Sequence, residues 1–158
     1  MAAGYSVVAP QTVQPNQPLI LTDTQCPCGS GMVFKKSGGV FLLASNAPSG
    51  NRCLCGCRQI YKTDYEVDVH MNVEIPSGGT VDTIQFAISV DGVVDPASIM
   101  SATPAAVEEA ANIGMSVIES VVSLCGCESI AVVNIGTQPI IVNNASLVFD
   151  YGGTRRVR

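Results

Sequence analysis

Two stretches in which apolar and polar residues alternate strictly dominate the pattern of this chain. In residues 65–75 every odd position is apolar and every even position is polar. A period of two places all the apolar side chains on one face of a β-strand and all the polar ones on the other. Residues 84–90 repeat the pattern after Pro-Ser-Gly-Gly at 76–79, a sequence that favours a turn. The pattern predicts two long antiparallel strands in the core of a β-sandwich or barrel, each with one face exposed to solvent.

Shorter segments of strand character fill most of the remaining chain. Residues 32–34 and 40–43 flank Ser-Gly-Gly, and Asp-Gly at 91–92 is a favoured two-residue turn, so both places predict hairpins. Further candidate strands are residues 18–22, 93–103, 113–124, 130–133 and 140–149. Roughly nine or ten short strands with regularly spaced turns indicate an all-β antiparallel sandwich or jelly roll.

Two segments leave alternatives open. Residues 104–111 have a helical composition after Thr103, and they predict either one short helical turn or an Ala-rich loop. Residues 113–124 are apolar at both parities. Such a strand is covered on both sides, so it lies either centrally in the sandwich or at a subunit interface.

The two ends of the chain differ from its middle. Residues 1–17 carry Pro10 and Pro15 among scattered Val and Gln, and we expect them to form an extended N-terminal arm that anchors on a neighbour. The jelly-roll domain is expected over residues 18–151. Residues 152–158 contain the only basic cluster, with three arginines, and are expected to form a basic C-terminal tail.

Composition narrows the classes of function. The 158 residues carry a formal net charge of −5 and no basic patch, which argues against nucleic acid as a partner. No segment approaches the roughly 18–20 apolar residues of a membrane span. The N-terminus lacks the features of a signal peptide, so we expect synthesis in a host cytoplasm. Only 13% of the residues are charged and the mean hydropathy is +0.34, so a partner or copies of the chain are expected to hide much surface.

Several segments, taken in order, resemble the tumour-necrosis-factor-like (TNF-like) and complement-like globular heads. They are VQPNQPLIL, VFLLAS, YEVDVHMNVEIPSGG, IQFAISVDGV and SIAVVNIGTQPIIVNNASLVFD, within residues 12–150. More narrowly, the chain resembles the small heads of phage head-fibre or capsid decoration proteins and of exosporium fibres. No collagen-like repeat precedes the head, and the cysteine pairs lie outside the general family pattern. The resemblance implies a TNF-like jelly roll that forms a compact homotrimer.

Seven cysteines fall into three Cys-X-Cys groups. They are Cys26, Cys28, Cys53, Cys55, Cys57, Cys125 and Cys127. If each strand crosses the sandwich antiparallel to the one before it, all three groups reach the same end. Three chemistries remain open: a structural zinc site, disulfides between loops, or free thiols in tight turns. The odd count argues against complete internal pairing, and cytosolic synthesis argues against early oxidation. In each case the cysteines staple the fold and do not form an active site.

The chain offers no constellation for catalysis. The single histidine, His70, lies on a polar strand face between Asp68 and Asn72, and no nucleophile or ligand partner accompanies it. Glu66, Asp68 and Glu74 share this face, which we interpret as solvated and not as a weak cation site. A zinc-dependent hydrolase would need an open metal position and a nearby base, which His70 alone cannot supply. The sequence therefore predicts a protein that is not an enzyme.

Two functions from different classes fit these observations. The first is a structural protein of a phage virion, meaning a trimeric capsid decoration, cement or head-fibre subunit on the virion surface. It would bind the major capsid protein or another virion protein through residues 1–17. The second is the ligand-binding or host-binding head of a fibre or spore-surface protein, which would use its loops. The place of the protein on the particle distinguishes the two.

The cysteine staple can be tested directly. Replacing Cys55 and Cys125 with Ser should lower the melting temperature, because the bonds that join distant loops are lost. Elemental analysis and thiol titration of one sample separate bound zinc, missing thiols and seven reactive thiols. A double variant with the same melting temperature as the wild-type protein would contradict the proposal that the cysteines stabilise the fold.

Overall fold

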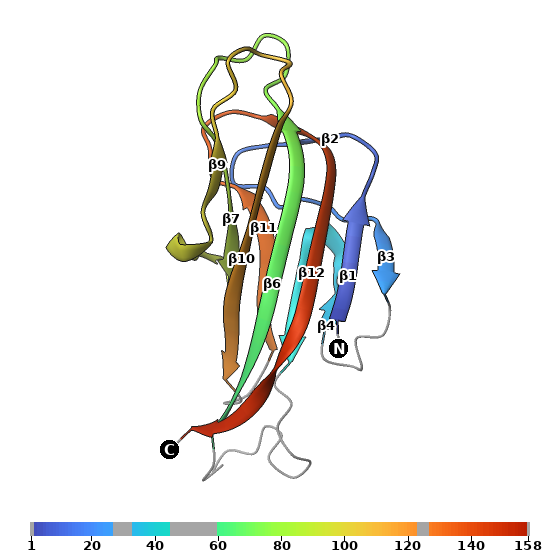
Figure 1. The fold of residues 1–158 in the computed structure, drawn as a ribbon, viewed down its shortest axis with the longest axis vertical. Helices are drawn as coiled ribbons and strands as arrows, with labels where there is room; N and C mark the ends of the chain where they lie inside the picture. Colours follow the sequence, from blue (N-terminus) through green and yellow to red (C-terminus); the bar gives the residue numbers. More distant parts are fainter. Residues whose placement is uncertain (1, 27–32, 45–59, 123–126, 158) are drawn as a thin grey trace.

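The computed structural model describes residues 2–26, 33–44, 60–122 and 127–157. These residues form twelve strands and two 3₁₀ turns (Figure 1). The strands are β1 (Ala2–Val7), β2 (Gln11–Val13), β3 (Asp23–Cys26), β4 (Val33–Lys35), β5 (Val40–Ala44), β6 (Ile60–Glu74), β7 (Ile84–Val90), β8 (Val93–Val94), β9 (Met100–Ala102), β10 (Ala111–Val122), β11 (Cys127–Asn134) and β12 (Ile140–Val157). The 3₁₀ turns are η1 (Ser37–Gly39) and η2 (Pro96–Ser98).

The strands form two antiparallel sheets that pack face to face (Figure 1). Sheet A has the order β10-β6-β12-β1-β3, and β2 also pairs with β12. Sheet B has the order β4-β5-β11-β7-β8, and β9 also pairs with β7. From β6 onward the chain passes repeatedly between the sheets, with β6, β10 and β12 in sheet A and β7 and β11 in sheet B. This is the predicted all-β jelly-roll sandwich.

The strand predicted from strict alternation lies inside sheet A, as β6. Its alternate side chains are all buried: Tyr65, Val67, Val69, Met71 and Val73, followed by Ile75. The intervening side chains are exposed or half-buried on the solvent side. Because the period of two matches the pleat, every apolar side chain of this stretch enters the core. The prediction for residues 65–75 is confirmed, and β7 occupies the second predicted stretch.

A cluster of aromatic rings joins the two sheets. The ring centroids of Tyr5 (β1) and Phe41 (β5) lie 4.6 Å apart, and those of Phe41 and Phe149 (β12) lie 5.4 Å apart. The hydroxyl of Tyr65 also donates a hydrogen bond across the sandwich to the backbone carbonyl of Ala44. Aromatic pairs at such separations stabilise a core beyond their buried area. The N-terminal strand therefore belongs to the centre of the fold.

Both predicted hairpins are present. β4 and β5 pair on either side of η1. An added Cβ at Gly39 would lie 2.2 Å from the carbonyl oxygen of Leu19, so glycine is required for this close approach. In the second hairpin, Asp91 and Gly92 both have positive φ, 48° and 83°, as a type I′ turn between β7 and β8 requires.

Several boundaries differ from the prediction. β6 and β7 run in opposite directions but belong to different sheets, because residues 75–83 cross from one sheet to the other. The expected return strand over residues 93–103 is divided into β8, η2 and β9. Residues 104–110 form a loop without a helix, in which the Glu109 carboxylate accepts hydrogen bonds from the backbone of Ala105 and Ala106. Instead of a strand, residues 18–22 make one isolated bridge, from Pro18 to Val133.

The strand that is apolar at both parities, β10, lies at an edge of sheet A. It pairs with β6 alone among the described strands. Ile113 and Val121 face the core and are buried, whereas Ile118 points outward and is 69% exposed. The central position is therefore wrong. The alternative position at a subunit interface stays a prediction.

The predictions for both chain ends are wrong in the described part. β1 pairs with β12 over six residues, and Ala3, Tyr5, Val7 and Val13 are buried, so residues 2–13 are not an arm outside the core. The apolar parity of Ala3, Tyr5 and Val7 is short, and small residues obscure it. At the other end β12 continues to Val157 and stays paired with β6, so this segment is a strand and not a tail.

The core position of β1 gives a stability test. Tyr5→Ala should reduce the free energy of unfolding by about 3–5 kcal/mol, because it removes a buried ring from the aromatic cluster. Val8→Ala is the matched control, because Val8 is 75% exposed and its loss should change stability by less than about 0.5 kcal/mol. Urea denaturation of both variants measures the difference. Equal midpoints would show that this segment lies outside the core.

Candidate functional site

The predicted cysteine site falls mostly outside the described residues. Those outside are Cys28, Cys53, Cys55, Cys57 and Cys125. Cys26 ends β3, and Cys127 begins β11 opposite Ala44, but the side chains of these two cysteines are also outside the description. The strands that flank the three cysteine segments all begin or end toward one end of the sandwich (Figure 1), which agrees with the antiparallel count. Whether the sulfurs meet there stays a prediction.

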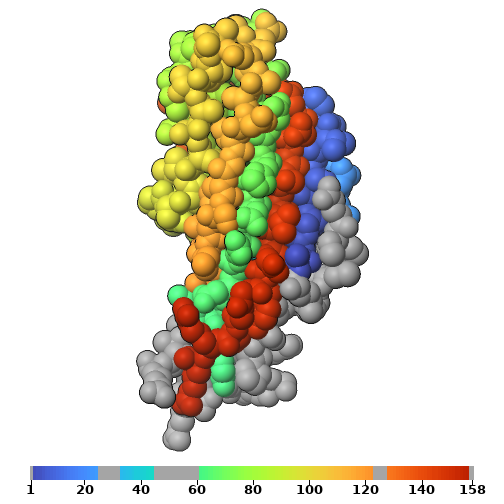
Figure 2. Space-filling view, in the orientation of Figure 1, coloured from blue at the N-terminus to red at the C-terminus, as the bar shows by residue number. Residues whose placement is uncertain are grey.

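The one histidine lies on the solvent side of sheet A, the face that Figure 2 presents. The strand partners of His70 are Gly114 of β10 and Ser146 of β12. An added Cβ at Gly114 would lie only 2.6 Å from His70 Nδ1, so glycine leaves room for the imidazole. An open depression lies around His70 and its strand partner Gly114. Small, polar or amide side chains supply much of its lining, among them Ser6, Asn112, Asn144 and Ser146.

A ladder of amides crosses the same face. The Asn72 amide donates to Asn112 at 2.9 Å, and the Asn143 amide donates to both Asn72 and Glu74 at 3.0 and 3.2 Å. Glu66 similarly accepts a hydrogen bond from Ser116. These contacts use the carboxylates as acceptors within the sheet. Across the described residues, no three His, Cys, Asp or Glu side chains gather as a metal site.

The most perturbed side chain is Glu119, on the core side of β10. Its register partner is the buried Tyr65, and its Oε1 is buried with no hydrogen-bond partner among the described residues. Burial, reinforced by the charge of Asp95, a hydrogen bond with it, and the charge of Glu128, raises the pKa of Glu119 to about 7. Burial also raises the pKa of Glu128, with a smaller contribution from Asp91. An acidic cluster therefore occupies the side of the sandwich where β10 meets η2 and β11.

This acidic cluster was not predicted from the sequence, although the alternation of positions in β10 contains a signal for it. Glu119 has the same parity as Ile113 and Val121, which face the core, so it is an acid in a row of core positions. The alternation is hidden because the outward positions of this strand also carry apolar side chains such as Ile118. Asp95 and Glu128 come from other elements, and sequence spacing alone does not bring them together.

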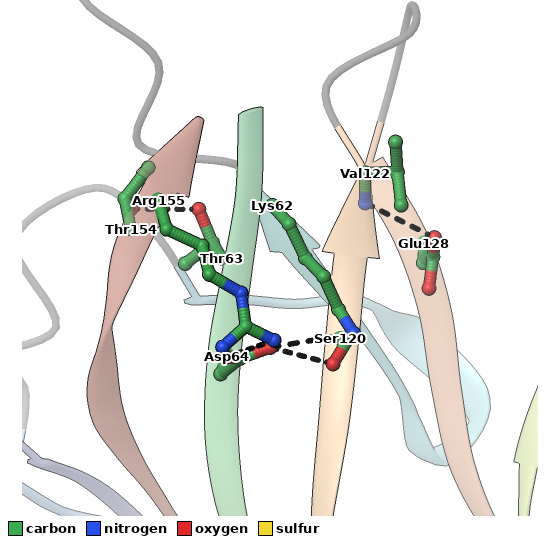
Figure 3. Close-up of polar contacts among 8 residues, drawn as sticks. All are labelled: Lys62, Thr63, Asp64, Ser120, Val122, Glu128, Thr154 and Arg155. Carbon is green, nitrogen blue, oxygen red and sulfur yellow. Dashed lines mark hydrogen bonds and ion pairs between the residues drawn. The ribbon is translucent and has the colours of Figure 1, made fainter. Parts of the chain in front are cut away.

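A second polar group fixes the end of β12 (Figure 3). Asp64 lies 3.3 Å from the Arg155 guanidinium and 3.9 Å from the Lys62 ammonium, and it accepts a hydrogen bond from Ser120 at 2.6 Å. The three strands β12, β6 and β10 thus meet at one carboxylate. Arg155 is mostly exposed, so solvent weakens its ion pair. This contact holds part of the segment that the sequence had suggested was a tail.

The architecture matches solved structures of TNF-like jelly-roll heads. Eiger TNF from S. frugiperda superposes with a TM-score of 0.62 at 10% identity, covering 94% of this chain and 90% of that one. The globular domain of zebrafish complement 1qA protein superposes with a TM-score of 0.55 at 8% identity, covering 98% of both chains. The chain thus has the TNF-like jelly-roll fold, and the resemblance of its sequence to these heads is confirmed at the level of fold.

Sequence-level comparisons add nothing further, because no family model and no curated protein matches this chain. Of the described residues, none form a helix with the length and apolar content that a membrane crossing needs. The identities to the two solved structures are 10% and 8%, so these matches define the fold alone.

The raised pKa of Glu119 predicts a pH-dependent stability. The folded protein holds this proton up to about pH 7, whereas an unfolded chain releases it near the ordinary glutamate pKa of 4.5. The stabilisation of the folded protein by the proton on Glu119 is therefore complete below pH 4.5 and is lost as the pH rises through 7. At about 1.4 kcal/mol per pKa unit, and allowing for screening, Glu119→Gln should stabilise the protein by about 1–2 kcal/mol at pH 8 and much less at pH 5.

Denaturation at the two pH values measures this difference. Glu66→Gln is the matched control, because Glu66 is exposed on the opposite face of the same sheet. A Glu119→Gln effect that is equal at pH 5 and pH 8 would contradict the protonation argument.

Proposed function

We propose that the chain is a non-enzymatic head that associates with copies of itself, as the homotrimer implied by the sequence resemblance. The TNF-like jelly roll supports this proposal as a fold. On the solvent-side face of sheet A the strand partners of His70 are Gly114 and Ser146, and none of the hydrogen bonds found among the described residues joins His70 to Ser146. The chemistry of that face is suited to contact and not to bond making.

The observation that carries the proposal is the distribution of exposed apolar side chains. Eight large apolar residues are prominently exposed in the described part of the chain. Seven lie toward the two lateral sides of the sandwich: Val93, Val94, Ile99 and Ile118 on the β8–β10 side, and Val8, Ile20 and Phe34 on the β1–β4 side. Apolar side chains grouped at two opposite edges favour burial against other protein surfaces.

For the setting of this head we propose the surface of a phage virion, as a capsid decoration, cement or head-fibre protein. The support is the narrower sequence resemblance and the low content of charged residues, 13%. The partners would be the other copies and a capsid or other virion protein. Attachment would not use a free arm at residues 2–13, because those residues include two strands of sheet A.

A ligand- or host-binding head on a fibre or spore surface is the second candidate. One observation favours it: side-chain contacts hold the loops at the end opposite the cysteine segments. Gln138 exchanges two hydrogen bonds with the backbone of Thr80, and Thr83 contacts Thr103 at 2.9 Å. Loops held in this way can present a fixed binding surface.

Self-association can be measured on the purified full chain. Light scattering at micromolar concentration should return three times the chain mass of 16.4 kDa, because the exposed edges are buried on neighbouring copies. A monomer that persists at high protein concentration would contradict the proposed head.

The setting has a separate test. Mass spectrometry of purified phage particles should detect the chain as a stoichiometric virion component. Its absence from particles, together with binding of the recombinant head to intact host cells or spores, would favour the second candidate.

A further inference from the structure

The acidic edge is the lateral side formed by β8, η2 and β10. Its exposed apolar side chains are Val93, Val94, Ile99 and Ile118. Its acidic side chains are Asp91, Asp95, Glu119 and Glu128. No lysine or arginine occurs between Lys62 and Arg155, and these two residues form their ion pairs with Asp64 of β6. Among the described strands, β10 and β8 each pair on one side only, which leaves one side of each strand open.

The opposite side, which we call the lysine edge, is formed by β3 and β4 (Figure 1). Phe34 of β4 and Ile20, shortly before β3, are exposed apolar side chains at this edge, and Val8 is exposed after β1. Lys35 and Lys36 lie here, and Lys35 Nζ donates to the Thr22 carbonyl at 2.9 Å. One acidic residue, Asp23 of β3, also lies at this edge. Every other acidic residue of the chain lies within residues 63–154. β3 and β4 likewise pair on one side only in the described part of the chain.

We propose that the acidic edge of one protomer docks against the lysine edge of a second copy, head to tail. This inference rests on the proposed self-association and assigns its two surfaces. Each edge combines apolar side chains with open strands, and their charges have opposite sign. Asp91, which is exposed, supplies a negative charge at the acidic edge that a lysine of the neighbouring copy can approach.

The chemistry of the edges selects a second copy over an unrelated partner. Two different surfaces that complement each other on one chain form a heterologous contact, which repeats from copy to copy. The repeat closes as a ring when the rotation between copies permits, and three copies would close it in the proposed homotrimer. Complementary charge steers the encounter and fixes the orientation, while burial of the apolar side chains holds the contact.

Charge reversal on exposed side chains tests the docking. Lys36→Glu places an acid opposite the acidic edge, and Val93→Lys places a cation opposite the lysine edge. Each variant should raise the Kd of self-association about 100-fold or more, because like charges then meet across the contact. The double variant, with both substitutions in one chain, should recover much of the loss, because the reversed charges again attract. Sedimentation velocity in 0.05 M and 0.5 M NaCl measures each Kd.

Two controls match the changes in charge. Arg156→Glu matches Lys36→Glu on an exposed residue of β12, and Val81→Lys matches Val93→Lys on an exposed residue of a loop away from both edges. Thermal melts confirm that each variant folds. A wild-type trimer with all variants unchanged, or weakened equally with the controls, would overturn the docking and leave the proposed head intact. A monomeric wild-type protein would overturn both.

Discussion

The pairing of β6 with β12 is the interaction on which the rest of the structure depends. These two long strands run side by side from Glu74 opposite Ile141 to Ile60 opposite Val157. Their core faces supply Val67, Val69, Leu147 and Phe149, all almost fully buried. β10 adds to the free side of β6 and β1 to the free side of β12, so this pair fixes which strands become lateral edges. Slipping the register by one residue would turn the buried side chains to solvent.

The sequence was most informative where one physical rule acted alone. The alternation in β6 and the Asp91-Gly92 turn predicted their structures directly, because a pleat and a positive φ are local properties. β1 was missed because Ala3 and Gly4 weaken its alternation, and its place is decided by pairing with residues 145–150 far along the chain. The passage of the chain between the sheets after Ile75 is likewise a tertiary choice. Glu119 was missed because the residues that perturb it come from other elements.

The two faces of sheet A differ in chemistry. The core face is mostly apolar, with the buried Thr63 near its end and the perturbed Glu119 at its edge. The solvent-side face is a hydrogen-bonded surface of amides, serines and one histidine, with Gly114 making room for the imidazole. Such a face offers directional hydrogen-bonding contacts. Apolar exposure is concentrated instead at the lateral edges, where charges of opposite sign accompany it, and this separation is the basis of the proposed association.

The most direct test of self-association through complementary edges is an experimental structure of the assembled full chain by electron cryo-microscopy or crystallography. It should show copies related head to tail, with the side chains of Val93 and Ile118 buried on a neighbour beside Phe34 or Val8. An assembly in which β8, β10, β3 and β4 all remain open to solvent would contradict this account.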